Sequence, residues 1–108
     1  MINKILKSAG VNYKRTRFSS PPKGTYAVYM DDQSADGPDG INAVITHEYT
    51  IEVYESAPDD ATEEAIEAAL NAAGLRWTKQ DRYWLQDVQR YQVIYEFTYI
   101  EKRRINHG

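Results

Sequence analysis

The sequence contains no cysteine and no long apolar run, and these absences exclude several classes of protein. Without thiols there are no disulfides, no thiolate catalysis and no cysteine-based zinc site. No stretch approaches the roughly 20 apolar residues of a membrane-spanning helix, and residues 1–6 lack the apolar segment of a signal peptide. We therefore expect a soluble protein that is made and used in a cytoplasm.

Charge of one sign is missing from two long segments of the chain. Residues 1–25 contain no Asp or Glu, and residues 26–70 contain no Lys or Arg. The first segment carries six bases, the second twelve acids, and residues 71–108 seven bases and four acids, within a net charge of −3. Such sorting either is neutralised inside one folded domain or leaves faces of opposite sign that meet another subunit. The mildly acidic net charge argues against general nucleic-acid binding.

The remaining features are typical of one small globular domain. A chain of 108 residues, 42% of them hydrophobic, has room for a single core. Apolar residues at helical spacing predict a helix ahead of Gly10 and another between Asp59 and Gly74. Alternating, β-branched and aromatic residues predict five strands, at 11–18, 25–30, 41–53, 75–79 and 91–101.

The order of these elements, α-β-β-β-α-β-β, predicts an α+β fold with a single mostly antiparallel sheet and two helices packed on one face. Residues 31–40 hold four Asp, two Gly and one Pro, which predicts an exposed loop at the end of a long hairpin. We expect one domain over residues 1–101, followed by a flexible basic tail at 102–108.

The acidic segment partly matches a calcium-binding loop. Residues 32–37 follow the opening of an EF-hand, but Asp39 stands where an apolar residue belongs and Ala43 where a bidentate Glu is needed. The flanking segments are also predicted strands rather than helices. We interpret the segment as a solvated acidic loop, with a weak calcium site as the alternative.

No other group of residues predicts catalysis. His47 lies on the apolar face of its strand, where a lone histidine is usually a hydrogen-bonded core or groove residue. Glu48 and Glu52 share the other face, but their neighbours indicate solvent rather than a pocket. The six glycines form no phosphate-binding loop, and Ser19-Ser20 lacks the glycines of a nucleophile elbow. We expect no enzyme, no metal and no cofactor.

Aromatic residues are abundant, with nine Tyr and two Trp. Tyr83 and Trp84 fall in a predicted turn and are the aromatics expected to be exposed, as at a protein interface. A platform for stacking bases is the rival interpretation, but the acids of the sheet face would repel a phosphate backbone. Ile94 and Ile100 interrupt the polar side of the last strand, so part of that side is expected to be covered.

The whole chain resembles the small tail terminator (tail completion) proteins of long-tailed phages and prophages of Gram-positive bacteria. The resemblance covers residues 2–101 as a pattern of residue types and spacings, and it is carried by the stretches INKILKSAGV, TYAVYMDD, EYTIEVYES, TEEAIEAALNAAGL, RWTKQDRYW and YQVIYEF. It implies an α+β subunit of the virion neck, without enzymatic activity, that forms a ring, commonly a hexamer. Such a ring ends polymerisation of the tail tube and presents a surface to the head connector.

The sorted charges then suggest how subunits meet. A closed head-to-tail ring needs two different complementary patches, and opposite charge is one way to specify them. We predict that bases of one subunit face acids of the next, with the two aromatics also at an interface. The predicted interface residues are Lys14, Arg15, Arg17, Asp31, Asp32, Asp36, Asp39, Tyr83 and Trp84. The alternatives are another neck component, such as a head-closure, adaptor or minor capsid protein, and a small monomeric module that binds calcium or a peptide.

Overall fold

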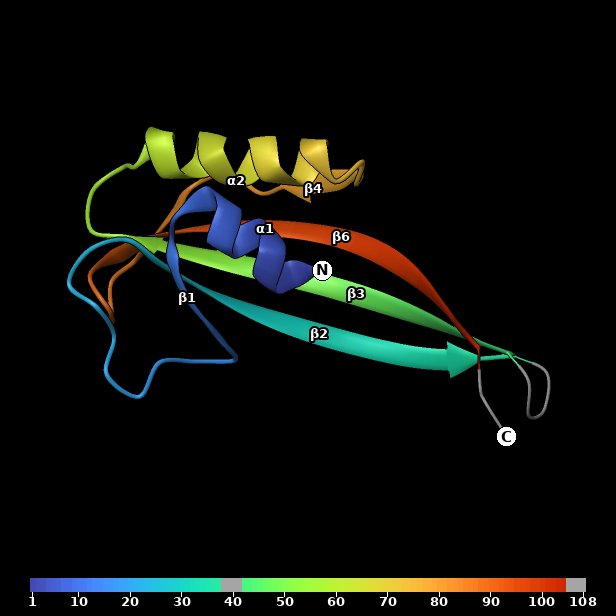
Figure 1. The fold of residues 1–108 in the computed structure, drawn as a ribbon. Helices are drawn as coiled ribbons and strands as arrows, with labels where there is room; N and C mark the ends of the chain where they lie inside the picture. Colours follow the sequence, from blue (N-terminus) through green and yellow to red (C-terminus); the bar gives the residue numbers. More distant parts are fainter. Residues whose placement is uncertain (38–41, 105–108) are drawn as a thin grey trace.

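The computed structural model describes residues 1–37 and 42–104, and within them the elements follow the predicted order with one addition (Figure 1). The α+β fold class is confirmed, and the addition is a short strand in the segment expected to be a turn. The elements are α1 (Ile2–Ala9), β1 (Asn12–Arg15), β2 (Tyr26–Asp36), β3 (Asn42–Glu55), α2 (Asp60–Ala72), β4 (Trp77–Lys79), β5 (Tyr83–Leu85) and β6 (Arg90–Arg104).

The strands form one sheet, with the order β1-β2-β3-β6-β4 and with β5 also paired to β6. β1 runs parallel to β2, and the other pairs are antiparallel. β3 and β6 are central and remain paired from Asn42↔Arg104 to Glu55↔Tyr91. β4 and β5 lie one after the other along the same edge of β6. The expected, mostly antiparallel sheet is thus confirmed.

Both helices pack on one face of this sheet, as expected (Figure 1). Ile5 and Leu6 of α1 are buried against the sheet, as are Ile66 and Leu70 of α2. Alternation along each strand directs every second side chain to this face, so the sheet contributes Ala27, Ile51, Val53, Val93 and Tyr95 to the core. Each fully buried aliphatic side chain stabilises the fold by about 2 kcal/mol.

Residues 31–36 of the loop expected at 31–40 belong to a strand instead, because β2 continues as far as Asp36. Its acidic residues have a low preference for strands, but each residue from Asp31 to Asp36 pairs with one of β3, from Tyr49 to Val44. Cross-strand pairing therefore outweighs local composition. Residues 38–41 lie outside the described residues.

Three other boundaries also differ from expectation. β1 ends at Arg15, because Thr16 takes a left-handed φ of 70° that turns the chain out of the sheet. Tyr83 and Trp84 begin a strand instead of a turn, since aromatic residues pack well on a sheet that offers an open edge. β6 continues to Arg104, so residues 102–104 of the expected tail are paired with β3.

Beyond the helices, β2, β3 and β6 project together as a three-stranded arm (Figure 1). We define the arm as residues 31–36, 44–49 and 97–102, which are paired residue by residue. The molecule is correspondingly elongated, with principal extents of 52, 28 and 21 Å. β1 pairs with β2 only as far as Tyr29, and β4 pairs with β6 only as far as Phe97. Among the described residues, both edges of the arm are therefore open.

Candidate assembly surfaces

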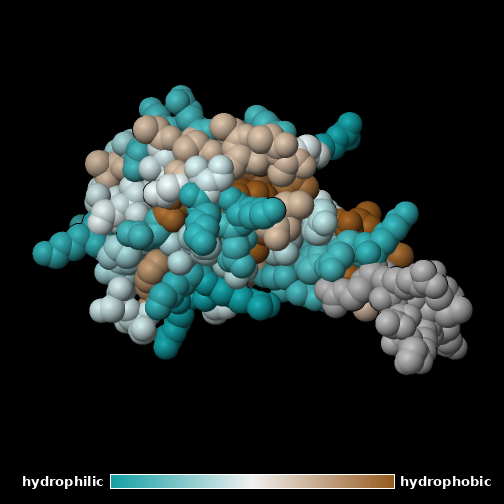
Figure 2. Space-filling view, viewed as in Figure 1, coloured by the Kyte–Doolittle hydropathy of each residue, from teal (hydrophilic) through white to brown (hydrophobic). Residues whose placement is uncertain are grey.

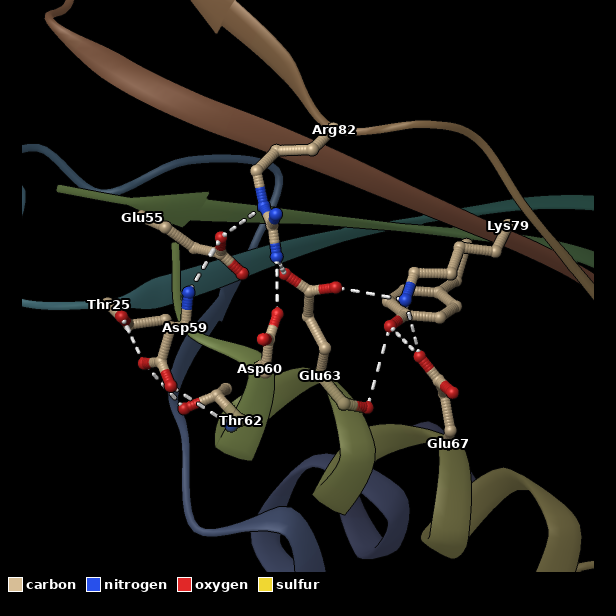
Figure 3. A network of polar contacts seen from close by, with 10 residues as sticks. Thr25, Glu55, Asp59, Asp60, Thr62, Glu63, Glu67, Lys79 and Arg82 are labelled. Carbon is tan, nitrogen blue, oxygen red and sulfur yellow. Dashed lines mark hydrogen bonds and ion pairs between the residues drawn. The ribbon is translucent and has the colours of Figure 1, made fainter. Parts of the chain in front are cut away.

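Arg82 neutralises several acids of residues 26–70, the segment without Lys or Arg, inside the subunit (Figure 3). It lies in the connection between β4 and β5, with Nη2 2.7 Å from Asp60 Oδ1 and 2.8 Å from Glu63 Oε2 of α2. Its Nε lies 3.3 Å from Oε1 of Glu55, at the end of β3. One guanidinium thus holds α2, β3 and the β4–β5 connection together.

Lys79 of β4 makes a second set of contacts with α2. Its Nζ lies 2.9 Å from Oε1 of Glu63 and 2.7 Å from Oε2 of Glu67, which also accepts a hydrogen bond of 2.7 Å from the Tyr95 hydroxyl. Hydrogen bonds with these two carboxylates outweigh burial and raise the pKa of Lys79. Part of the sorted charge is therefore paired within the subunit, between the second and third segments of the chain.

Glu55 and Glu63 form a buried carboxyl pair at the centre of this network. Burial, reinforced by a hydrogen bond with Glu63, raises the pKa of Glu55 to about 7. Burial also opposes ionisation of Glu63, but hydrogen bonds from Glu55, Lys79 and Arg82 outweigh it and lower its pKa. Oε2 of Glu55 is buried and has no hydrogen-bond partner in the described part of the chain. A buried oxygen without a donor is less unfavourable on a protonated carboxyl than on a carboxylate, in keeping with the raised pKa of Glu55.

Asp59 caps α2, at the start of the helix predicted between Asp59 and Gly74. Its Oδ1 accepts a hydrogen bond of 3.1 Å from the Thr62 backbone N–H, and its Oδ2 accepts one of 2.6 Å from the Thr25 hydroxyl (Figure 3). These bonds lower the pKa of Asp59, and the bond from Thr25 has the largest effect. The cap ties the helix to the segment that enters β2.

The predicted basic residues lie on the outer edge of the sheet. Lys14 and Arg15 belong to the edge strand β1, and Arg17 follows the left-handed turn at Thr16. All three side chains are exposed, and none forms an ion pair with a described residue. Lys14 Nζ lies over the ring of Phe18, 5.6 Å from its centroid. We call Lys14, Arg15 and Arg17 the basic edge; its charge is available to a partner.

The predicted acids lie on the arm. Asp32 and Glu48 are exposed and stand opposite each other on β2 and β3. Because Tyr49 points into the core, Glu48 points to the sheet face away from the helices. Like charges at facing positions disfavour each other, so a cation from a partner would be stabilising there. Asp36 is also exposed, whereas Asp39 lies outside the described residues.

Asp31 differs from the other predicted acids because it is paired with His47. Asp31 Oδ1 lies 3.0 Å from Nδ1 of His47, and Glu101 Oε1 lies 2.8 Å from Nε2. The imidazole stacks on Tyr49 with an interplanar angle of 2°. Burial disfavours the imidazolium, but the hydrogen bonds with Glu101 and Asp31 outweigh it and raise the pKa of His47. The expected hydrogen-bonded role of His47 is confirmed, and it joins all three strands of the arm.

Tyr83 and Trp84 are exposed, as predicted, by 65% and 39%. The Trp84 ring packs edge-on against Tyr91, and its Nε1 donates a hydrogen bond of 3.0 Å to Gln86 Oε1. β5 pairs with the start of β6, whereas the end of β6 belongs to the arm, so β5 lies away from the arm. Those predicted interface residues that the structure describes thus occupy three separate places, namely the basic edge, the arm and β5, and one subunit does not bring them together.

A groove that sequence reasoning missed lies where β4 stops along the edge of β6. It has a volume of about 1050 Å³ and is lined by the start of β4, the end of α2 and the central strands. Hydrophobic residues reach the surface where β6 leaves the cover of α2 (Figure 2). Ile100, on the polar side of β6, is 58% exposed. The only indication of the groove in the sequence was that Ile100 interrupts the polar side of its strand. The expectation that Ile100 is covered is not met within the subunit.

Neither a metal site nor a membrane span emerges from the described residues. They contain no group of three or more His, Asp or Glu side chains arranged to hold a metal ion. None of their helices has the length and apolar character needed to cross a membrane.

Comparison with known proteins identifies the fold. No family model matches the sequence, and no curated protein matches it either. Among solved structures, the chain is similar to one in the virion of a native gene transfer agent particle, with a TM-score of 0.61 and 18% sequence identity. The similarity covers 92% of this chain and 84% of that one. At this identity the likeness establishes a shared fold over nearly the full length.

Proposed function

We propose that the protein is a structural subunit of a phage-like virion, and specifically a tail terminator that caps the tail tube as a ring and joins it to the head connector. The observation that carries this proposal is the shared fold with a chain of a gene transfer agent virion over 92% of the residues. The sequence resemblance to tail terminators supports the narrower role. The site of action would be the neck of the virion, reached after assembly in the host cytoplasm.

The unpaired charges support a head-to-tail contact between subunits. Lys14, Arg15 and Arg17 form a positive edge on β1, while Asp32 and Glu48 form a negative pair on the arm. Two different, complementary patches on one subunit are what a heterologous ring requires. The basic edge of one subunit therefore contacts the acids of the arm of the next, and the contact also fixes the register between them.

Charge reversal tests this contact. We expect Arg15→Glu with Arg17→Glu to lower the fraction of oligomer in native mass spectrometry at low salt, where screening is weakest. Lys4→Glu with Lys7→Glu is the matched control, since it makes the same charge change on the exposed side of α1. Adding Asp32→Lys and Glu48→Lys to the first variant should restore assembly. If the first variant assembles as the wild type does, the contact is misassigned.

Electron microscopy distinguishes the terminator from other neck components. The protein is mixed separately with purified tail tubes and with capsids of the same particle. A terminator decorates tube ends and limits their growth, whereas a head-closure or adaptor protein decorates the capsid portal. A monomer that gains calcium in native mass spectrometry and decorates neither would instead indicate a small binding module.

A further inference from the structure

We propose that the open edge of β6 in the arm is a docking site for an extended, basic segment of a partner protein, which adds to the sheet as an antiparallel strand continuing the line of β4. The inference goes beyond the proposed ring, because it concerns a different edge of the sheet and a partner other than the basic edge, although Asp32 and Glu48 contribute charge to both surfaces.

The backbone supplies the first part of the site. The Ile94 carbonyl accepts a hydrogen bond of 2.9 Å from the Gln80 N–H, so the polar groups of Ile94 point to the β4 side of β6. In an antiparallel strand both groups of a residue point the same way, and the direction alternates. The register between β3 and β6 is unbroken, so Thr98 and Ile100 direct their N–H and C=O groups to the same side. β4 starts at Trp77, opposite Phe97, and leaves these groups without a strand partner in the described chain.

The groove supplies the second part. Its walls at this edge include Leu75 and Trp77 on one side and Ile100 on the other. Trp77 is held in place, because its Nε1 donates a hydrogen bond of 2.9 Å to Asn71 Oδ1 and its ring packs edge-on against Tyr95. An added strand would direct its apolar side chains to Leu75 and Trp77 on the helix face of the sheet. Its basic side chains would lie on the opposite face, where their aliphatic stems would cover the exposed Ile100.

The charge of the groove selects the partner. Asp32, Glu48 and Glu96 line it, against the single base Arg76 among the lining residues. Glu96 accepts a hydrogen bond of 2.9 Å from Gln80, which does not cancel its charge. Strand addition gives affinity through the main chain and specificity through alternate side chains. The complementary segment therefore alternates basic and apolar residues. The other open edge, along β2, has only polar or small side chains from Asp32 to Asp36 and is less suited to such a segment.

A designed peptide tests the site directly. The probe is a capped ten-residue peptide of alternating Lys and Val, titrated into a Trp84→Phe variant so that Trp77 alone reports binding by fluorescence. We expect saturable binding, with slowed amide hydrogen exchange at Thr98 and Ile100. Methylating the peptide nitrogens that face β6 should weaken binding at least about tenfold, since the main-chain hydrogen bonds are lost. A peptide of alternating Glu and Val should not bind.

Variants of the protein provide the matched comparison. Ile100→Pro removes an N–H from the open edge of β6, where proline is tolerated because no ladder bond is broken. Ala35→Pro makes the same change on the open edge of β2. The Tyr29 carbonyl accepts a hydrogen bond from the Thr16 N–H on this edge, and the direction alternates along the strand, so the N–H of Ala35 points to the same edge. Ile100→Pro should abolish peptide binding and Ala35→Pro should preserve it, with both folds checked by circular dichroism.

Several outcomes would overturn the proposal. They are the absence of binding by the Lys–Val peptide, binding that N-methylation or Ile100→Pro leaves intact, and equal binding of the Glu–Val peptide. Protection of Thr98 and Ile100 that rises with protein concentration, without peptide, would identify a second copy of the chain as the occupant instead. The methylated peptide keeps the test decisive even where Ile100→Pro fails to fold. Loss of the ring in the variant with Arg15→Glu and Arg17→Glu has no bearing on these results, because neither residue lines the groove.

Discussion

Glu55 and His47 are buried side chains that hold a proton more tightly in the folded protein than in the unfolded chain. A raised pKa contributes stability that is complete below the unfolded value and is lost as pH rises through the folded value. For Glu55 this window runs from 4.5 to about 7, and for His47 it begins at 6.5. We expect the free energy of unfolding in urea to fall by about 1 to 3 kcal/mol between mildly acidic and mildly alkaline pH.

A Glu55→Gln variant isolates the contribution of the carboxyl pair. The amide can accept from Arg82 and donate to Glu63 as the protonated acid does, but it does not ionise. Its unfolding free energy should therefore decline less with rising pH than that of the wild type. An unchanged pH dependence would show that Glu55 is already ionised in the fold. Below pH 4 both proteins should lose stability, because the pKa values of Asp59 and Glu63 are lowered.

Arg82 is the residue on which the network most depends. Its replacement by Met leaves buried Glu63 without one of its two bases, so we expect a loss of about 1 to 3 kcal/mol in thermal or urea unfolding, reduced because Arg82 is 30% exposed. Arg76→Met, also at the surface and without an ion pair to a described residue, should change stability by less than about 0.5 kcal/mol. If both variants lost the same unfolding free energy, the role assigned to Arg82 would be wrong.

Among the elements, the arm depends most on a single interaction, because beyond Tyr49 and Phe97, which belong to the core, it projects past the helices (Figure 1). His47 bonds to Asp31 of β2 and Glu101 of β6. We expect His47→Ala to accelerate amide hydrogen exchange in 31–36 and 97–102 while leaving α1 and α2 unchanged. Thr46→Ala, one residue away on the opposite face, should not. Acceleration throughout the molecule would mean that His47 supports the whole core rather than the arm.

The elements also show what the sequence could and could not predict. α1, α2, β3 and β6 follow from periodicity, because each carries enough apolar residues at one spacing to define a face. The strand nature of 31–36 could not be predicted, since it results from pairing with β3 and not from its own composition. The short β5 was missed for the same reason. Strands of three residues carry too little pattern to be distinguished from turns.

At the scale of the whole molecule, the charge segments proved only partly informative. The acids of α2 were explained locally, by a helix cap and by Lys79 and Arg82, which the linear sequence could not pair with them. The basic edge forms no ion pair with a described residue, which is one of the two outcomes that the sorting left open. The groove along β6 was not predictable, because it depends on where β4 stops relative to β6. The sequence indicated it only through Ile100, an apolar residue on the otherwise polar side of its strand.

If the basic edge and the arm join subunits, assembly should depend on ionic strength. Exposed charges are screened beyond about 10 Å at 0.1 M salt and beyond about 3 Å at 1 M. Sedimentation velocity should therefore show the oligomer dissociating as salt is raised. Arg15→Glu with Arg17→Glu should remove most of this salt dependence along with the oligomer. A salt-insensitive oligomer would point to an apolar interface, for which β5 offers Tyr83 and Trp84.

The long pairing of β3 with β6 has a mechanical consequence. The two strands share fourteen consecutive residue pairs, and their hydrogen bonds lie perpendicular to the strand direction. A pull on the tip of the arm, directed along the strands and away from the helices, loads these bonds together in shear instead of opening them one at a time. Force applied across the arm would peel it from the tip inward. The protein should thus be stiff along its long axis and more compliant across it.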